Sequence, residues 1–301
     1  MDAVNTLPTK TREVQHALMD STIWNAFTYR PDDIVIASWS KSGTVWVQQI
    51  VGQLLFEGAP DVPVADMSVW VDMVFPPKEE KLAHLEAQQH RRFLKTHLPA
   101  DALPFSPTAR YVYAGRDGRD VVWSLYNHHA SFTDEFYAMV NERPGRIGPP
   151  LPRPPDSIRE YFHEWLDRDG YPFWSFWESV RSWWELRHLP NVRLQHFNAL
   201  KADMEGEMRS LAVFLEIPID ESHWNDIVRH CSFDYMRNHA PNSVPLGGRI
   251  WKDGARSLIY KGVNGRWRDV LTAADVERYE RVAREQLGDA CASWLAGTSR
   301  A

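Results

Sequence analysis

The 301-residue sequence contains only two cysteines, Cys231 and Cys291. So few cysteines exclude a disulfide scaffold or a cysteine-rich zinc site, and they are typical of a reducing compartment. No apolar run approaches the roughly 20 residues needed to span a membrane. The segment Met1 to Arg12 also lacks the basic stretch and apolar run of a secretion signal. We therefore expect a cytoplasmic protein that is neither secreted nor inserted into a membrane.

The sequence also lacks an excess of positive charge, since its formal net charge is −6 at pH 7. A general attraction to nucleic acid or to an anionic membrane is therefore not expected, and an anionic ligand would have to be held by local groups. Hydrophobic residues make up 44% and charged residues 25% of the chain, which excludes wholesale disorder. The fourteen Trp, ten Tyr and thirteen Phe residues suit a large core and also stacking on a flat ligand.

Short β-branched segments alternate with helical patterns along the chain. The run from Ile34 to Ser38 predicts a strand, and the apolar spacing from Thr44 to Phe56 predicts a helix directly after it. Further strands are expected at Arg92 to Thr96, Arg110 to Ala114 and Asn191 to Phe197. Further helices are expected at Ser157 to Leu166, Phe176 to Arg187, Met204 to Leu215, Trp224 to His230 and Ala273 to Leu287. This order predicts an α/β fold with a central parallel sheet flanked by helices.

The last of these helices carries both of its boundary signals. Thr272 and Asp275 have capping-box spacing at its start, and Gly288 is expected to end it.

Two segments interrupt the alternation. Arg143 to Pro155 is rich in proline and glycine, and Asn238 to Ser257 contains few apolar residues, so both are expected to be long loops near the functional site. The first could instead be a linker between domains. Because helices and a strand resume after it, we expect one domain over residues 1–301, with residues 1–29 as an N-terminal extension.

The segment Ser38 to Trp46 lies where a strand ends and a helix begins, a position that favours binding of an anion. Gly43 lets the backbone approach a ligand closely, and Lys41 supplies a positive charge. An ordinary turn with a solvated lysine is the alternative. The sequence contains no Gly-Lys dipeptide, so a Walker A loop, and with it a typical nucleoside triphosphatase, is disfavoured.

Two further strands bring polar groups to the same edge of the expected sheet. Arg116 follows the strand that ends near Ala114, where a magnesium-binding Asp is absent, and Ser124 lies eight positions further on. Arg116 offers a planar fork to a phosphate, unless it pairs with a neighbouring aspartate. Lys95 and His97 end another strand, and histidine is the most frequent base for a hydroxyl proton near neutral pH.

Six motifs then occur in a characteristic order. They are Arg30-Pro-Asp-Asp-Ile-Val-Ile, Lys41-Ser-Gly-Thr44 with Trp46, Lys95-Thr-His-Leu-Pro99, Arg116 with Ser124, Trp183-Trp-Glu185, and Lys261-Gly-x-x-Gly-x-Trp267. In this order the chain resembles the cytosolic sulfotransferases from about Arg30 to Glu277. The resemblance implies one α/β domain with a P-loop-like phosphate-binding loop. It also implies the donor 3′-phosphoadenosine 5′-phosphosulfate (PAPS), used without a metal to sulfate a small-molecule hydroxyl.

The resemblance also implies roles for individual residues. His97 would accept the hydroxyl proton, Lys41 would contact the leaving group, and Lys95 would support the transition state. Ser124 would restrain Lys41 and, with Arg116, bind the 3′-phosphate, while Trp46 and Phe233 would enclose the adenine. The implied donor-binding residues are Lys41, Ser42, Gly43, Thr44, Val45, Trp46, Arg116, Ser124, Phe197, Phe233, Tyr260, Lys261 and Gly262.

The chain departs from the family pattern at several of these positions. Trp39-Ser40 replaces Tyr-Pro, and Val45, Phe197 and Cys231 replace a Thr, a Tyr and a Thr. Tyr260 replaces an arginine that contacts the 3′-phosphate, for which Arg256, Arg266 or Arg268 could substitute. The dimer signature is degraded to Arg268-x3-Thr272-Ala-x3-Glu277, so homodimerisation stays open. Because Lys41, His97, Ser124 and Arg116 are retained, catalysis is expected to be retained.

The acceptor is the least defined part of the prediction. Trp70, Phe75 and His128 lie in segments that line the acceptor pocket of similar enzymes, although the two aromatic residues would equally suit the core. A phenol or a small aromatic or alicyclic alcohol fits best, and a hydroxylated lipid would fit the same residues.

Three other functions stay open. A magnesium-dependent kinase with a phosphate loop and a non-catalytic protein that binds PAPS are the two main alternatives. A nucleic-acid-binding protein, based on the arginines between Arg249 and Arg268, is the weakest because the chain is acidic overall.

Overall fold

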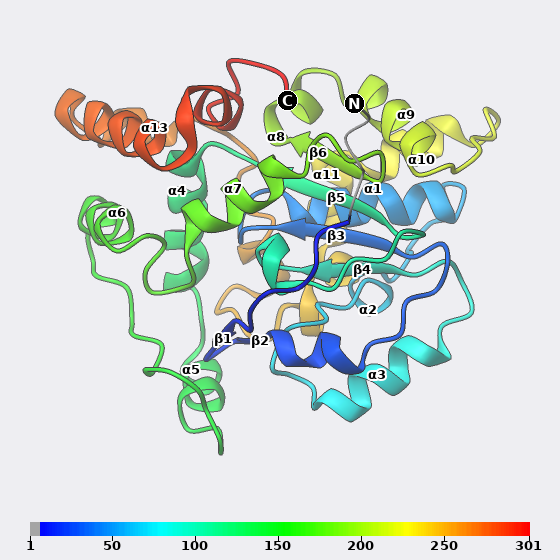
Figure 1. Ribbon diagram of the computed structural model, residues 1–301, viewed down its shortest axis with the longest axis horizontal. Coiled ribbons are helices and arrows are strands. Elements are labelled where there is room, and N and C mark those ends of the chain that lie inside the picture. The colour runs from blue at the N-terminus through cyan, green and yellow to red at the C-terminus, as the bar shows by residue number, and fades with distance from the viewer. Residues whose placement is uncertain (1–6) are drawn as a thin grey trace.

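A four-stranded parallel sheet forms the centre of the computed structural model, which describes residues 7–301 (Figure 1). The order across the sheet is β4-β3-β5-β6, and β3 pairs with β4 on one side and β5 on the other. The strands are β3 (Ile34–Ser38), β4 (Phe93–Thr96), β5 (Arg110–Gly115) and β6 (Val192–His196). The predicted α/β fold with a central parallel sheet is confirmed. All four carboxyl ends therefore lie at one edge of the sheet, where ligands bind in such folds.

Alternate residues of β3 face two different layers, as expected for a strand that is buried on both sides. Ile34 and Ile36 belong to one apolar cluster, and Val35 and Ala37 belong to another. The helices that pack in the first cluster are α1 (Thr44–Leu55), α2 (Val64–Met67), α8 (Phe197–Ala202), α9 (Met204–Phe214) and α10 (Trp224–His230). Phe197, which was expected to end a strand, instead begins α8, because the His196 side chain caps that helix.

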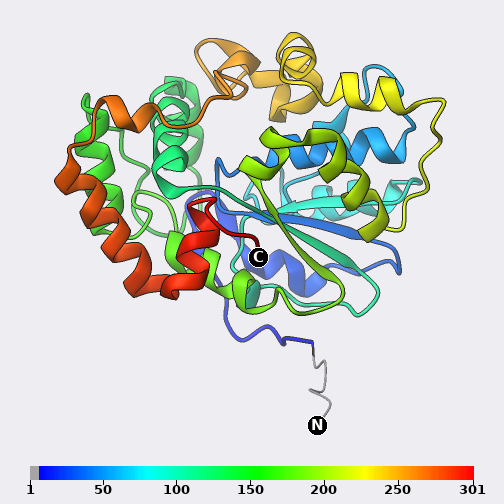
Figure 2. The ribbon, with the colours of Figure 1, turned by 90° about the horizontal axis from the view of Figure 1, so that it is seen from above.

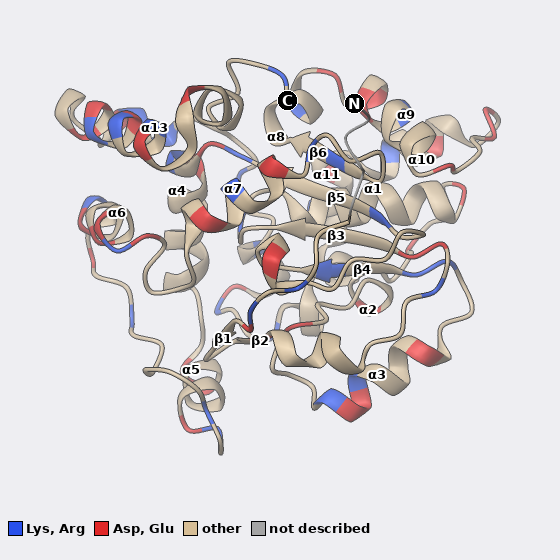
Figure 3. Ribbon diagram, in the orientation of Figure 1, with Lys and Arg blue, Asp and Glu red and all other residues tan. Residues whose placement is uncertain are grey.

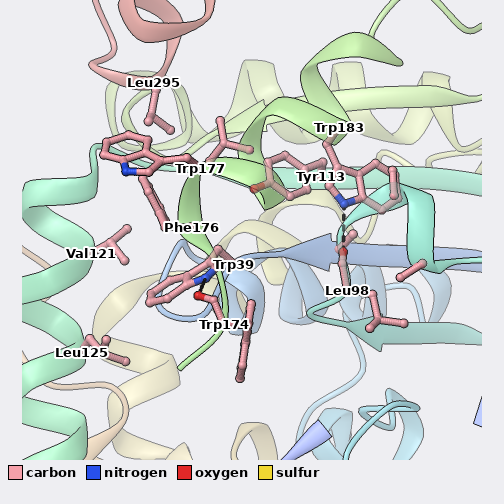
Figure 4. Packing of buried hydrophobic residues seen from close by; sticks show 14 of the residues in the cluster. Trp39, Leu98, Tyr113, Val121, Leu125, Trp174, Phe176, Trp177, Trp183 and Leu295 are labelled. Carbon is pink, nitrogen blue, oxygen red and sulfur yellow. Dashed lines mark hydrogen bonds between the residues drawn. The ribbon is translucent and has the colours of Figure 1, made fainter. Parts of the chain in front are cut away.

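The second cluster is larger and rich in tryptophan. Trp39 is buried in it against Trp174, and its Nε1 donates to the Trp174 carbonyl at 3.0 Å; Trp183 donates similarly to Leu98 (Figure 4). The helices of this layer are η1 (Ser21–Ala26), α3 (Lys78–Ala87), η2 (Ala100–Ala102), α4 (Gly118–Ala130), α6 (Ile158–Asp167), α7 (Phe176–Glu185), η5 (Arg266–Asp269) and α13 (Ala273–Leu295). Charged residues of both signs lie along the outer helices α13 and α3 (Figure 3).

The predicted end of the last helix is wrong. The capping box of Thr272 and Asp275 is present, but α13 resumes beyond Gly288, where the backbone leaves the helical region, and ends at Leu295. The extra turns bury Trp294, whose ring lies 5.5 Å from that of Trp184. Burial of this large side chain extends the helix past its glycine.

A third apolar cluster joins segments that are far apart in the sequence. It includes Leu18 from the short hairpin of β1 (Gln15–His16) and β2 (Met19–Asp20), within the expected N-terminal extension, whose residues 1–6 lie outside the described residues. The other elements of this cluster are α5 (Asp134–Asn141), α11 (Phe233–Asn238), α12 (Ala240–Ser243) and η4 (Gly254–Ser257). The short helix η3 (Pro245–Gly248) contacts α12 and η4. The segment α11 to η4 runs along the top of Figure 2.

The two expected loops differ in the structure. Residues 143–155 contain no helix or strand, as predicted. Residues 238–257 instead form short helical turns, because buried side chains such as Val244 and Trp251 anchor them to the third cluster.

Candidate active site

A cavity of about 440 Å³ opens at the carboxyl ends of the strands. Lys41, Lys95 and Arg116, which follow or end β3, β4 and β5, all line it. The sequence-predicted residues that line it are Lys41, Gly43, Thr44, Val45, Trp46, Trp70, Lys95, His97, Arg116, Ser124, His128, Phe197, Phe233, Tyr260, Lys261 and Gly262. The fold therefore brings together most of the residues expected from the sequence.

The first turn of α1 is open to an anion. Gly43 precedes the helix with φ at 105°, and no side chain caps this end, so the first backbone N–H groups point toward the cavity without a side-chain partner. A Cβ at Gly43 would lie 2.8 Å from Phe197 Cδ2. Both the left-handed backbone and this close approach require glycine. Ser42 does not line the cavity, because it is buried in the turn and its N–H donates to the Trp39 carbonyl.

Positive charge gathers in the cavity, and the carboxylates nearest to it within residues 7–301 lie behind the lining. Burial, with Lys95 and Arg116 nearby, lowers the pKa of Lys41 to about 7. Burial also lowers the pKa of Lys95 to about 8, and Asp72 acts in the opposite direction. No aspartate or glutamate lines the cavity within residues 7–301, whereas its cationic residues are Lys41, Lys95, Arg116, Lys201, Lys261 and Arg266. The lowered pKa values show that loss of a proton relieves part of this charge, and an anion that joins the cluster would favour its fully charged form.

Arg116 does not pair with a neighbouring aspartate. Its Nε and one terminal nitrogen both donate to Asn264 Oδ1, at 3.1 and 2.6 Å, and its guanidinium lies 4.3 Å from the centre of the Phe197 ring. Asp117 forms an ion pair with Arg119, and Asp120 accepts a hydrogen bond from the Gly265 N–H. The planar fork of Arg116 thus faces a neutral amide oxygen that an anion can replace.

His97 is held in the orientation of a base. Its Nδ1 donates to the Ser38 carbonyl at 2.7 Å, which leaves Nε2 as the acceptor nitrogen. Burial and the nearby Lys95 lower the pKa of His97 well below its ordinary value, so the ring is neutral at pH 7. The ring of Trp70 meets it edge-on at 4.7 Å, and the ring of Trp174 stacks at 5.7 Å.

Two of the three residues expected to bind the acceptor line the cavity, and the third does not. Trp70 and His128 line the cavity, but Phe75 is not among the lining residues and instead packs under the Arg143 guanidinium. Residues that the sequence did not indicate also line it: Leu18, Phe132, Phe136, Trp174 and Trp251. Their segments carry no motif, so only the apolar character of their side chains could have suggested them, together with the expected position of residues 238–257 in the case of Trp251. Residues 143–155 contribute nothing to the lining, whereas Pro245, Ile250 and Trp251 of residues 238–257 do.

Over residues 7–301, no group of three or more His, Cys, Asp or Glu side chains is placed to hold a metal ion. Within the same residues, no helix has both the length and the apolar character to cross a membrane.

Comparison with known proteins identifies the family. A sequence model of the sulfotransferase domain matches residues 31–290, so the chain belongs to the sulfotransferase family. It is 32% identical to a glycolipid sulfotransferase of Mycobacterium bovis (strain BCG / Pasteur 1173P2), over 90% of each chain. It is 30% identical to human sulfotransferase 1E1, over 87% of this chain and 86% of that one.

Solved structures show the same fold. Mouse sulfotransferase SULT7A1 complexed with PAP superposes with a TM-score of 0.70 at 21% identity, covering 92% of this chain and 93% of that one. Retinol dehydratase in complex with androsterone and the inactive cofactor PAP gives a TM-score of 0.67 at 24% identity, covering 89% and 84%.

Proposed function

We propose that this protein transfers the sulfuryl group of PAPS to a hydroxyl group of a small, apolar or aromatic acceptor. The observation that carries the proposal is a cavity lined by cationic side chains and, within residues 7–301, by no carboxylate, next to an uncapped helix N-terminus and a neutral histidine. A polyanionic donor supplies the missing negative charge, and the histidine supplies the base. Family membership and the PAP named in the structure of a related fold support this choice of donor.

In the proposed donor site, the cationic residues of the cavity lie next to the phosphate groups of PAPS. The backbone of Gly43 to Val45 binds the 5′-phosphate, and Lys41 neutralises the leaving oxygen. Ser42 is left out of these contacts because its N–H already donates to Trp39. Arg116 and Ser124 bind the 3′-phosphate, while Trp46, Phe197 and Phe233 surround the adenine. The remaining proposed contacts are Tyr260, Lys261 and Gly262, which line the same end of the cavity.

Arg266 is the best replacement for the family arginine that Tyr260 displaces. It lines the cavity, forms no ion pair within residues 7–301, and is close enough to Arg116 to lower the pKa of that guanidinium. Arg256 does not line the cavity, and Arg268 stacks on Trp267 at 4.5 Å. Of the three candidates, Arg266 alone combines access with an unbalanced charge.

The proposed reaction is an in-line displacement at sulfur. The acceptor oxygen forms a bond to sulfur while the bond from sulfur to the 5′-phosphate oxygen breaks, and PAP leaves. The hydroxyl proton passes to Nε2 of His97, which is an acceptor because Nδ1 donates to Ser38. Lys41 and Lys95 stabilise the negative charge that develops on the oxygens, in place of a metal ion.

The acceptor end of the cavity favours an apolar alcohol. Aromatic and aliphatic side chains such as Leu18, Phe136 and Trp251 line it, which selects flat or apolar molecules. The mycobacterial relative is named a glycolipid sulfotransferase, and this name supports a hydroxylated lipid as an alternative to a phenol. Both classes therefore belong in the first acceptor screen.

The test is transfer from labelled PAPS to a panel of phenols, alicyclic alcohols and glycolipids in the presence of EDTA. We expect a labelled sulfate ester to form with at least one acceptor. Binding of PAP without transfer to any acceptor would favour the non-catalytic alternative. Magnesium-dependent binding of ATP in place of PAP would favour the kinase.

A further inference from the structure

Asp72 is a buried carboxylate beside the proposed catalytic residues, and no motif pointed to it. Its side chain is 0% exposed. Oδ1 accepts from Trp24 Nε1 at 3.3 Å, and Oδ2 accepts from Trp70 Nε1 at 2.6 Å and from the backbone N–H of His97 at 3.2 Å. Burial raises the pKa of Asp72, whereas the N–H groups that each oxygen receives act in the opposite direction and favour the ionised carboxylate.

The segment that carries Asp72 runs beside β4 like a short additional strand. Trp70 forms a parallel bridge with Lys95, and the N–H groups of Val71 and Lys95 each donate across the pair at 2.9 Å. This register places Asp72 level with His97. On its other side, the buried Lys81 donates to the carbonyls of Val71 and Met73, the residues that flank Asp72. The position of the carboxylate is thus fixed from both sides.

Trp70 links this carboxylate to the two proposed catalytic groups at the end of β4, Lys95 in the strand and His97 directly after it. Its ring meets the imidazole of His97 edge-on, with centroids 4.7 Å apart and planes at 78°. The same ring lies 4.9 Å from Nζ of Lys95, within the range of a cation–π contact. A rotation of Trp70 away from Asp72 would therefore release both His97 and Lys95.

We propose that Asp72 is a positioning residue for sulfuryl transfer, which holds His97 through its backbone N–H and holds both His97 and Lys95 through Trp70. This inference rests on the proposed function and extends it to a residue that contacts neither donor nor acceptor. It predicts that the Asp72 carboxylate affects the rate of transfer more than the binding of the donor, because it contacts none of the residues proposed to bind the donor phosphates.

An amide replaces this carboxylate only in part. In Asp72→Asn the single oxygen can take the Oδ2 position and accept from Trp70 and His97, and the NH2 group then leaves Trp24 without an acceptor. The hydrogen bonds that remain are weaker, because the acceptor no longer carries a charge. Removing the negative charge also removes the influence that raises the pKa of Lys95. The variant should therefore hold Trp70 and His97 less firmly and also titrate Lys95 at a lower pH.

The experiment compares wild type, Asp72→Asn, Trp70→Phe and a control, Asp33→Asn. Asp33 is another fully buried carboxylate, but it pairs with Arg92 at the opposite end of the sheet. For Asp72→Asn we expect kcat to fall at least tenfold, the Kd for PAP to stay within about twofold, and the alkaline limb of the kcat profile to move to lower pH. Trp70→Phe keeps a ring but removes the indole N–H, and should lower kcat in the same sense.

Asp33→Asn should lower stability while the folded protein keeps its kcat and pH profile. The proposal is overturned if folded Asp72→Asn keeps kcat within twofold of wild type, or if Asp33→Asn reproduces its pH shift. If Asp72→Asn does not fold, an unchanged kcat in Trp70→Phe overturns it instead. The wild-type protein is measured first. If it neither binds PAP nor transfers sulfate, the proposed function itself is contradicted, whatever the variants do.

Discussion

The indole of Trp70 meets the imidazole of His97 edge-on, 4.7 Å between ring centroids, while its own N–H is held by Asp72 at 2.6 Å. Together with the bond from His97 Nδ1 to the Ser38 carbonyl, this contact fixes the ring on two sides. The remaining nitrogen, Nε2, is the one that can accept a proton. The orientation of the base is thus set by β3 and by the segment before α3, rather than by the strand that carries it.

His97→Ala should abolish transfer while the protein keeps its affinity for PAP. Removal of a general base costs about 10²–10⁴-fold in rate, and Lys41, Arg116 and the α1 N-terminus remain to bind the donor. Single-turnover transfer and PAP calorimetry measure the two effects separately. His128→Ala is the matched comparison, because His128 lines the same cavity and should change the acceptor KM more than kcat. Equal turnover by wild type and His97→Ala would remove His97 from the mechanism.

Gly43→Ala should lose donor binding. The new Cβ would lie 2.8 Å from Phe197 and would force φ of 105° on alanine, a backbone penalty of about 1–2 kcal/mol. Gly145→Ala is the control, since it also has positive φ but nothing within 4 Å of its Cβ. We expect the Kd for PAP to rise at least tenfold in the first variant only. A similar Kd in both would show that Gly43 does not approach the donor.

Donor binding should take up protons above neutral pH. Burial, with Lys95 and Arg116 nearby, lowers the pKa of free Lys41 to about 7, and an anionic donor favours its charged form. The sign is therefore proton uptake on binding, and PAP affinity should fall from pH 7 to pH 9 by about tenfold per unit for each proton taken up. Calorimetry in buffers of different ionisation enthalpy measures this uptake. Lys41→Met should bind more weakly and with less uptake, and a pH-independent wild-type affinity would contradict the assignment.

Arg266→Ala should weaken recognition of the 3′-phosphate. A hydrogen bond to a charged group contributes about 1.5–3 kcal/mol, so we expect the preference for PAP over 5′-AMP to fall by about 10–100-fold. Arg268→Ala is the control, because Arg268 stacks on Trp267 instead of lining the cavity. If Arg268→Ala has the larger effect on this preference, then Arg268, and not Arg266, takes the place of the family arginine that Tyr260 displaces.

The sequence predicts the parts of the site that depend on local patterns. A strand followed directly by Lys41 and Gly43 indicates an anion-binding turn, and strand ends place His97 and Arg116 at the same edge of the sheet. The placement of these residues at one edge is confirmed, because short-range patterns determine each strand and parallel pairing then aligns their ends. Binding of an anion by the turn stays a prediction.

The parts that the sequence did not predict depend on contacts between distant segments. Asn264 meets Arg116 across 148 positions, and Leu18 reaches the cavity from the hairpin before β3. Asp72 acquires its three N–H partners only when its segment aligns beside β4. None of these pairings has a local signature, because each is determined by how whole layers pack.

The measurement that tests the account most directly is the affinity of the protein for PAP compared with 5′-AMP, by calorimetry without magnesium. Cationic side chains line the cavity, whereas no aspartate or glutamate lines it within residues 7–301. We therefore predict that PAP binds at least 100-fold more tightly than 5′-AMP and that EDTA has no effect on either affinity. Equal affinity for the two nucleotides, or binding that requires magnesium, would contradict the proposed PAPS site.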